Sequence, residues 1–193
     1  GDRIAVLAAN SVPYIATVLG IMRAGLVAVP VNFKFPPALI EYVLHDSGAR
    51  LVLHDQARAT AIPESIPRVA LDTPAFDAWR VAGEAPSYVP GDDDTALMLY
   101  TSGSTGKPKG VRLSHAGQWW TVDTRRKATS LSSERALIAA PLYHMNALAL
   151  AFLSLASHAT TILLPQFTAA AYIDAIGTYR CTWLTAVPPM IAM

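Results

Sequence analysis

The sequence predicts an α/β fold in which mostly parallel sheets are flanked by helices and arranged in two similar lobes. Apolar runs of strand length alternate with longer segments whose apolar residues recur at helical spacing. The runs are apolar at consecutive positions, as in strands that are covered on both faces. Composition agrees with a large buried core, since 52% of the 193 residues are apolar and only 15% are charged.

The first lobe is expected over residues 1–90, and its first strand over residues 4–8. Asn10 and Ser11 then offer an N-cap to a helix that Gly25 ends. Four apolar residues at helical spacing are expected to face inward from this helix, namely Val12, Ile15, Leu19 and Met22.

The first lobe continues with a strand at residues 27–31 and a helix that begins at Pro36 and Pro37 and ends at Gly48. The residues of this helix that are expected to face inward are Leu39, Ile40, Val43 and Leu44. Two further strands are expected at residues 51–53 and 69–71.

Residues 83–94 are rich in glycine, proline and aspartate, so we expect them to form an exposed connection between the lobes. The second lobe, residues 91–193, repeats the alternation of strands and helices. Its strands are expected at residues 96–100, 111–113, 136–140, 160–164 and 182–187. Its helices are expected at residues 116–128, 147–156 and 169–179.

Charge and cysteine content exclude several classes of protein. The net charge is +1 without a long basic run, so no nucleic-acid partner is expected. Cys181 is the only cysteine, which excludes an internal disulfide and favours a reducing, cytoplasmic location. The uncharged stretch at residues 136–173 is interrupted by prolines and histidines, so we expect no transmembrane segment. A homo-oligomer is compatible with this composition.

The ten residues directly after the strand at 96–100 are the candidate functional segment. They read TSGSTGKPKG, from Thr101 to Gly110, and combine four hydroxyl groups, three glycines and two lysines. Glycines let the backbone approach a ligand, hydroxyl and N–H groups donate hydrogen bonds, and lysines supply positive charge. The segment therefore predicts a loop that wraps an anion, and a phosphate chain fits it best.

Other glycine-rich loops fit less well. A Walker loop needs a longer spacing between its glycines and a Ser or Thr after the lysine, where Pro108 stands, and no GxGxxG fingerprint occurs. Ser104 and Lys107 have the spacing of serine–lysine enzymes, although Gly106 and Pro108 disfavour the helix of such a site. A serine–lysine amidohydrolase stays open as an alternative, as does a non-catalytic nucleotide-binding module.

The longer stretch LMLYTSGSTGKPKGVRLSH, residues 97–115, resembles the phosphate-loop signature of the AMP-forming adenylating superfamily, which includes acyl-CoA synthetases. Residues 1–32 resemble the early strand–helix–strand of this family. PLYHMNAL, residues 141–148, is similar to its segment with a proline, an aromatic residue and a histidine. VPPM, residues 187–190, resembles the entrance to its acyl-pocket helix. The resemblance therefore covers the chain.

The resemblance implies that an acid–thiol ligase activates a carboxylic acid, a fatty or other acyl acid, with ATP. Acyl-AMP and pyrophosphate would form first, and a thioester with CoA would follow. ATP, Mg²⁺ and CoA are the implied cofactors and co-substrate. The adenine and ribose segments of the family and its catalytic C-terminal lysine do not occur in these 193 residues. The chain is therefore expected to be a fragment of the large N-terminal domain, without the C-terminal domain and inactive alone.

The resemblance also implies roles for particular residues. Lys109 is the implied catalytic residue at the phosphates, and His144 is the implied catalytic residue at the border of the acyl pocket. The hydroxyl of Thr101 is implied to touch magnesium. The implied ATP- and phosphate-binding residues are Thr101, Ser102, Gly103, Ser104, Thr105, Gly106 and Lys109.

The residues alone leave a second interpretation of His144 open, because a histidine there could instead cap a helix or satisfy a buried hydrogen bond. Lys107 is expected to be solvated. His115 is expected to cap the helix that follows it, and Trp119 and Trp120 are expected to pack in the core from different faces of that helix.

Overall fold

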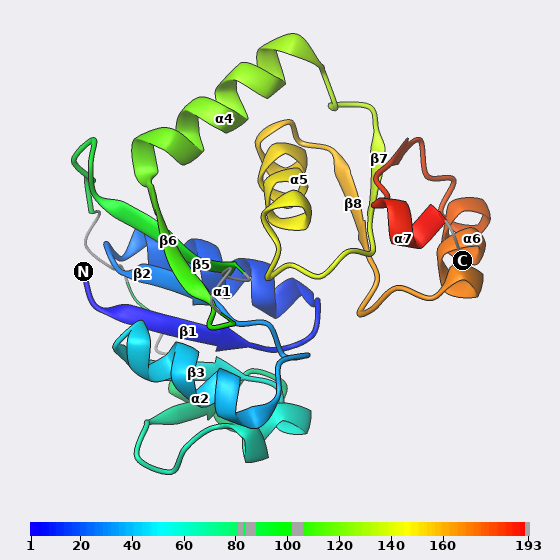
Figure 1. Cartoon of the computed structure of the whole chain (residues 1–193). Helices are drawn as coiled ribbons and strands as arrows, with labels where there is room; N and C mark the ends of the chain where they lie inside the picture. Colours follow the sequence, from blue (N-terminus) through cyan, green and yellow to red (C-terminus); the bar gives the residue numbers. More distant parts are fainter. Residues whose placement is uncertain (81–82, 84–87, 102–105, 192–193) are drawn as a thin grey trace. The chain divides into compact units, whose positions relative to one another are not determined.

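The computed structural model describes residues 1–80, 83, 88–101 and 106–191, which form the mixed α/β architecture that the sequence predicts. The chain divides into two compact units. The first unit comprises residues 1–8 and 13–118, and the second comprises residues 9–12 and 119–193. Figure 1 labels most of the helices and strands of both units.

The first unit is built on a six-stranded sheet in the order β4-β3-β1-β2-β5-β6. All neighbouring strands are parallel except that β6 runs antiparallel to β5. The strands are β1 (Arg3–Leu7), β2 (Val27–Pro30), β3 (Ala49–His54), β4 (Arg68–Ala70), β5 (Thr95–Thr101) and β6 (Lys109–Ser114). Because β2 and β3 lie on opposite sides of β1, right-handed crossovers require α1 and α2 to cover opposite faces of the sheet.

The two predicted helices of this unit, α1 (Val12–Arg23) and α2 (Pro37–Asp46), begin and end close to the predicted residues. The structure adds two short helices that were not predicted, the 3-10 helix η1 (Gln56–Ala61) after β3 and α3 (Pro74–Trp79). Gly25 and Gly48 follow α1 and α2 with φ of 72° and 63°, a left-handed conformation that glycine adopts without steric strain. The two predicted helix ends are therefore confirmed.

The inward face of α1 differs from the predicted one. Val12 is 74% exposed and Leu19 is 37% exposed, although both were expected to face inward. The buried residues of α1 are Tyr14, Ile15, Val18 and Ile21. Apolar residues surround most of this helix, so its spacing fits more than one inward face, and packing against the sheet selects among them.

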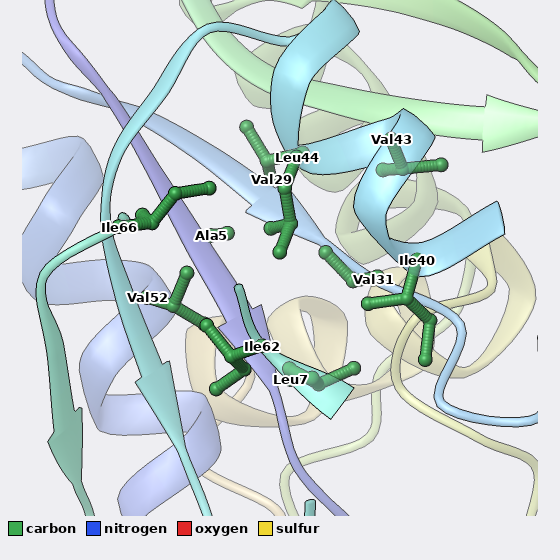
Figure 2. Packing of buried hydrophobic residues seen from close by; sticks show 10 residues of the cluster. All are labelled: Ala5, Leu7, Val29, Val31, Ile40, Val43, Leu44, Val52, Ile62 and Ile66. Atoms are coloured by element: carbon green, nitrogen blue, oxygen red, sulfur yellow. The ribbon is translucent and has the colours of Figure 1, made fainter. Parts of the chain in front are cut away.

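The core beneath α2 combines side chains from the helix and from three strands. Ile40, Val43 and Leu44 of α2 are buried as predicted, whereas Leu39 is only partly buried. Figure 2 shows the three buried side chains of α2 among those of the strands and of the segment after η1. The other members of the cluster are Ala5, Leu7, Val29, Val31, Val52, Ile62 and Ile66. Met98 and Tyr100 of β5 pack against the same cluster, so they lie on the face of the sheet that α2 covers.

The second unit contains a parallel three-stranded sheet in the order β8-β7-β9. Its strands are β7 (Arg135–Ile138), β8 (Thr160–Leu163) and β9 (Trp183–Leu184). The helices that follow β6 are α4 (His115–Ala128), α5 (Met145–Ala156), α6 (Ala169–Thr178) and α7 (Pro188–Ile191). Residues 147–154 of α5 are all buried, which explains the apolar composition of that segment.

Two features differ in extent from the prediction. The strand expected at residues 182–187 is only the two-residue β9, because it pairs with β7 at Trp183 and Leu184 alone. The expected lobes, residues 1–90 and 91–193, do not coincide with the two compact units, because β5 and β6 pair into the sheet of the first unit.

No helix within the described ranges could span a membrane. The longest of them, α4, has 14 residues, whereas a spanning helix needs about 20 apolar residues.

Candidate functional site

The predicted phosphate-binding segment lies at the end of the hairpin that β5 and β6 form in the first unit. Thr101, the last residue of β5, is the register partner of Lys109, the first residue of β6. Residues that are directly opposite in an antiparallel pair lie on the same face of the sheet. The hydroxyl of Thr101 and the ammonium of Lys109 therefore share one face, and both residues are exposed.

The site also has the location that ligands prefer in this class of fold. β5 runs parallel to β2, so Thr101 ends its strand at the edge where the carboxyl ends of the parallel strands meet. Ligands of open parallel sheets bind outside the carboxyl ends of the strands. Thr101 is therefore well placed to contact a ligand.

Residues between the two strands are described in part. Ser102, Gly103, Ser104 and Thr105, four of the expected phosphate-binding residues, lie outside the described residues. Gly106 has a φ of 83°, a conformation that favours glycine, and a Cβ there would meet no atom of the described residues within 4 Å. The backbone conformation at this position therefore favours glycine, and crowding by the described residues does not.

The two lysines of the segment have different surroundings. Pro108, which separates them, is buried, whereas Lys107 and Lys109 are exposed. The Lys107 ammonium lies 5.2 Å from the centre of the Tyr42 ring, within the range of a cation–π contact. Lys107 is thus exposed, as expected, but its ammonium also rests on an aromatic ring of α2.

Tyr100, next to Thr101, makes a contact that the sequence reasoning missed. Its hydroxyl donates a hydrogen bond of 2.7 Å to Asp46 Oδ2, while the Tyr42 hydroxyl donates one of 3.2 Å to Asp46 Oδ1. Burial and then this carboxylate raise the pKa of Tyr100 above its ordinary value, so the phenol stays protonated and donating. Tyr42 and Asp46 stand four residues apart on a helix, but no sequence signal linked them to Tyr100.

His144 belongs to the second unit, where it follows β7 as the N-cap residue of α5. Its backbone carbonyl accepts from Leu148 N at 3.2 Å, but its side chain makes no capping hydrogen bond. The imidazole is exposed, and its centre lies 4.6 Å from that of the Tyr143 ring. The side chain therefore neither caps α5 nor lies in the core. Its catalytic role stays a prediction.

Asn10 is a buried polar residue of the second unit, and its role was also missed. Its side-chain amide donates to Ala140 O at 2.9 Å and to Leu164 O at 3.1 Å, and its Oδ1 accepts from Leu142 N at 2.8 Å. The Asn10 side chain thus links the segments that follow β7 and β8 by hydrogen bonds. It does not act as the N-cap of α1 that its position suggested. The segment after β7 leads to His144.

Two expectations for the start of α4 are wrong. Ser114 Oγ, and not His115, accepts a hydrogen bond from the backbone of the first turn, at 3.1 Å from Gly117 N. Burial lowers the pKa of His115, and Asp94 partly opposes this shift. Trp119 and Trp120 were expected in the core but are 63% and 69% exposed. Gln118 is the one buried residue of α4.

Metal-ligating side chains do not cluster in the described part of the chain. No group of three or more His, Cys, Asp or Glu side chains is placed to hold an ion there. Cys181 is half-buried, and its thiol donates to Ala175 O at 3.3 Å, while burial raises its pKa. The hydroxyl of Thr101 is the expected magnesium contact, and it needs a ligand that brings further oxygen atoms.

Comparisons with known proteins agree on the family. The family described as AMP-binding enzyme matches residues 1–193. A feruloyl-CoA synthase from Amycolatopsis sp. is 37% identical over 98% of this chain and 39% of its own length. The long-chain-fatty-acid–CoA ligase FadD13 of Mycobacterium tuberculosis is 32% identical over 99% of this chain and 40% of its own. The chain therefore spans about two fifths of the length of the curated relatives that it matches.

A solved structure supports the same relationship at the level of the fold. O-succinylbenzoate coenzyme A synthetase (MenE) from Bacillus subtilis, in complex with ATP and magnesium ion, superposes with a TM-score of 0.84. The match has 26% sequence identity and covers 100% of this chain and 52% of that one.

Proposed function

Because the chain belongs to the AMP-binding enzyme family, we propose that the intact protein uses ATP to activate a carboxylic acid and then transfers the acyl group to CoA. A carboxylate oxygen attacks the α-phosphorus of ATP, so that acyl-AMP forms and pyrophosphate leaves. The CoA thiol then attacks the acyl carbon, and AMP leaves. The named relatives support this proposal, since both are CoA ligases or synthases.

The observation that carries the proposal is the pairing of Thr101 with Lys109 at the phosphate-loop end of the hairpin. It puts a hydroxyl donor and an ammonium on one face, beside a segment of glycines and hydroxyl residues. Attack of a carboxylate on ATP brings two anions together, and negative charge gathers on the leaving pyrophosphate. A preorganised ammonium stabilises that charge as it develops, and such electrostatic stabilisation is a large part of phosphoryl-transfer catalysis. We assign this role to Lys109.

The described residues offer Mg²⁺ one oxygen ligand near the phosphate segment, the hydroxyl of Thr101. Mg²⁺ prefers oxygen ligands and commonly reaches a protein together with the phosphates of its substrate. Thr101 offers one hydroxyl oxygen from the described residues, so the nucleotide would supply further ligands. When bound, the ion would neutralise phosphate charge. The solved relative that holds ATP and magnesium supports this assignment.

We propose a fatty or other acyl acid as the substrate, with His144 at the border of its pocket. Long-chain ligase activity in one named relative supports an aliphatic acid, whereas the feruloyl-CoA synthase favours an aromatic one. Both substrates are carboxylic acids, so the activation step is the same for either. The proposed location is the cytoplasm, which supplies ATP and CoA and keeps the free Cys181 reduced.

The two alternatives have less support. The family match does not favour an amidohydrolase that uses Ser104 and Lys107, and the Lys107 ammonium lies over the Tyr42 ring. A non-catalytic nucleotide-binding module would share the loop but not turn over, so kinetics separates it from a ligase.

The test is an exchange assay with the intact protein, Mg²⁺, ATP and labelled pyrophosphate, repeated with aliphatic and cinnamate-type aromatic acids. We expect pyrophosphate to enter ATP only when a suitable acid is present, and the acyl-CoA to be detected by mass spectrometry once CoA is added. Nucleotide binding without acid-dependent exchange would favour the non-catalytic module. Covalent labelling by a fluorophosphonate would favour the amidohydrolase.

A further inference from the structure

Tyr100 connects the hairpin of β5 and β6 to α2. Its hydroxyl donates to Asp46 across 54 positions of the sequence, at 2.7 Å. Asp46 is the last residue of α2, whose buried residues hold the helix against the sheet. Arg3 of β1 supports the same end of the helix, because its guanidinium donates to the carbonyls of Ser47 and Gly48 at 2.9 and 3.1 Å. The backbone at Asp46 is therefore held both by the packing of α2 on the sheet and by the hydrogen bonds from Arg3.

Gly110 of the second strand leaves room for this contact. It is the register partner of Tyr100, so both residues lie on the face that α2 covers. A Cβ at position 110 would stand 3.1 Å from Tyr100 Cζ and 3.2 Å from its hydroxyl oxygen, closer than ordinary van der Waals contact. The ring of Tyr100 thus lies over Gly110, and this lets its hydroxyl reach Asp46.

The opposite face of the same hairpin carries the phosphate-site residues. Successive side chains of a strand point to opposite faces, so Thr101 points away from α2, and its partner Lys109 does so as well. A contact that fixes the ring of Tyr100 on α2 therefore also fixes the directions of its neighbour Thr101 and of Lys109, the neighbour of Gly110. Lys107, beside the hairpin, lies over the Tyr42 ring of α2.

We propose that Tyr100 and Asp46 are positioning residues for the nucleotide, because their hydrogen bond holds the phosphate-loop end of the hairpin on α2 and so aligns Thr101 and Lys109. This inference rests on the proposed function for its ligand, ATP. Neither residue is proposed to touch the substrate. Gly110 contributes to the same positioning, since it leaves room for the ring of Tyr100.

The test uses Tyr100→Phe in the intact protein, which removes one hydroxyl and keeps the ring over Gly110. We expect the KM for ATP in pyrophosphate exchange to rise about tenfold, because a displaced hairpin end misplaces its donors. The KM for the carboxylic acid and the melting temperature should change little. A merely structural role would instead lower kcat through a smaller active fraction and leave both KM values unchanged.

Tyr42→Phe is the matched control. It removes the other phenol hydroxyl from Asp46, keeps the ring beneath Lys107 and breaks no contact between α2 and the hairpin. Its KM for ATP is expected to stay within about twofold of the wild-type value. Gly110→Ala should reproduce the effect of Tyr100→Phe by displacing the ring. An unchanged KM in Tyr100→Phe, or an equal rise in Tyr42→Phe, would overturn the proposal.

A second readout separates this inference from the proposed function. Amide hydrogen exchange of peptides that cover the ends of β5 and β6 is measured without ligand in the wild type, Tyr100→Phe and Tyr42→Phe. We expect faster exchange in Tyr100→Phe alone, whether or not the protein adenylates an acid. Equal exchange in the three proteins would refute the positioning role, whereas missing acid-dependent exchange in the wild type would refute only the ligase function.

Discussion

Lys107 and Lys109 stand two residues apart, yet the structure gives them different partners. Lys109 begins β6 opposite Thr101, whereas the ammonium of Lys107 lies over the Tyr42 ring. Sequence reasoning preferred Lys109 only through the resemblance to a family. The register of β5 and β6 supplies an independent physical reason, because it puts Lys109 on the face of Thr101.

In the intact protein, Lys109→Ala is expected to lower the rate of pyrophosphate exchange about 100- to 1,000-fold. Removal of a preorganised donor to a developing negative charge costs about 2.7–4 kcal/mol in comparable sites. Lys107→Ala should have a much smaller effect, and Lys34→Ala, at an exposed lysine of the first unit, controls for the loss of surface charge. Equal rates for Lys109→Ala and Lys107→Ala would contradict the assignment.

His144→Ala in the intact protein is expected to lower turnover with the carboxylic acid at least about tenfold, because a displaced carboxylate reacts slowly. Its unfolding free energy should change by less than about 0.5 kcal/mol, since the side chain is exposed and does not cap α5. Kinetics and urea denaturation are measured on the same preparation, with His45→Ala as the surface control. Loss of stability with unchanged kinetic constants would assign His144 a structural role instead.

At the scale of an element, α1 shows why a helical pattern does not determine an inward face. Its sequence VPYIATVLGIMR is apolar on most sides, so residues 12, 15, 19 and 22 fit the helical spacing. The structure instead buries residues 14, 15, 18 and 21. The choice depends on how the helix packs on the sheet, and that contact is absent from the local sequence.

Val18→Ala and Leu19→Ala test this face directly. Val18 is fully buried and Leu19 is 37% exposed. We expect Val18→Ala to lower the unfolding free energy by about 2 kcal/mol, through lost burial and a residual cavity. Leu19→Ala removes more carbon atoms but should cost less than about 1 kcal/mol. Urea midpoints of the two variants decide the matter, and a larger loss in Leu19→Ala would contradict the observed face.

Asn10 acts at the same scale, because it joins the segments after β7 and β8. Asn10→Ala would leave two carbonyls and one N–H without their present partner, so we expect a loss of about 3 kcal/mol in unfolding free energy. Asn146→Ala, at an exposed asparagine of the same unit, is the control and should change stability by less than about 0.5 kcal/mol. Similar urea midpoints for both variants would show that the ties of Asn10 are dispensable.

At the scale of the whole molecule, the chain combines two α/β units that each contain a mostly parallel sheet. The first unit carries the phosphate segment and the second carries His144. The curated relatives are more than twice as long as this chain, which covers 39–40% of their length. The activity is therefore proposed for the intact protein and not for these 193 residues alone.

A protein made of these 193 residues alone is expected to form no detectable acyl-CoA from ATP, CoA and the acid that the intact protein prefers. The segments that the family resemblance assigns to adenine, ribose and the catalytic C-terminal lysine do not occur in them, and positioned groups supply much of the rate enhancement of an enzyme. Mass spectrometry after overnight incubation is the measurement. Acyl-CoA above the level of a control without protein would contradict the expectation, most clearly at a rate near that of the intact protein.

The sequence by itself determined the class of fold and the positions of most strands and helices, and it singled out the segment for which phosphate binding is proposed. These features depend on apolar periodicity, helix-ending glycines and a ten-residue run of glycine, hydroxyl and lysine residues, which are all properties of short stretches. Even so, Ser102, Gly103, Ser104 and Thr105 stay predictions, since they lie outside the described residues.

Only the tertiary structure decided which elements share a sheet and which distant residues meet. It joined β5 and β6 to the first unit, moved the inward face of α1, and left Trp119 and Trp120 exposed. It also brought Tyr100 to Asp46 across 54 positions and Asn10 to Ala140 across 130. Partners this far apart are selected by strand order and packing, so no local pattern specifies them, and the positioning of the phosphate segment depends on such contacts.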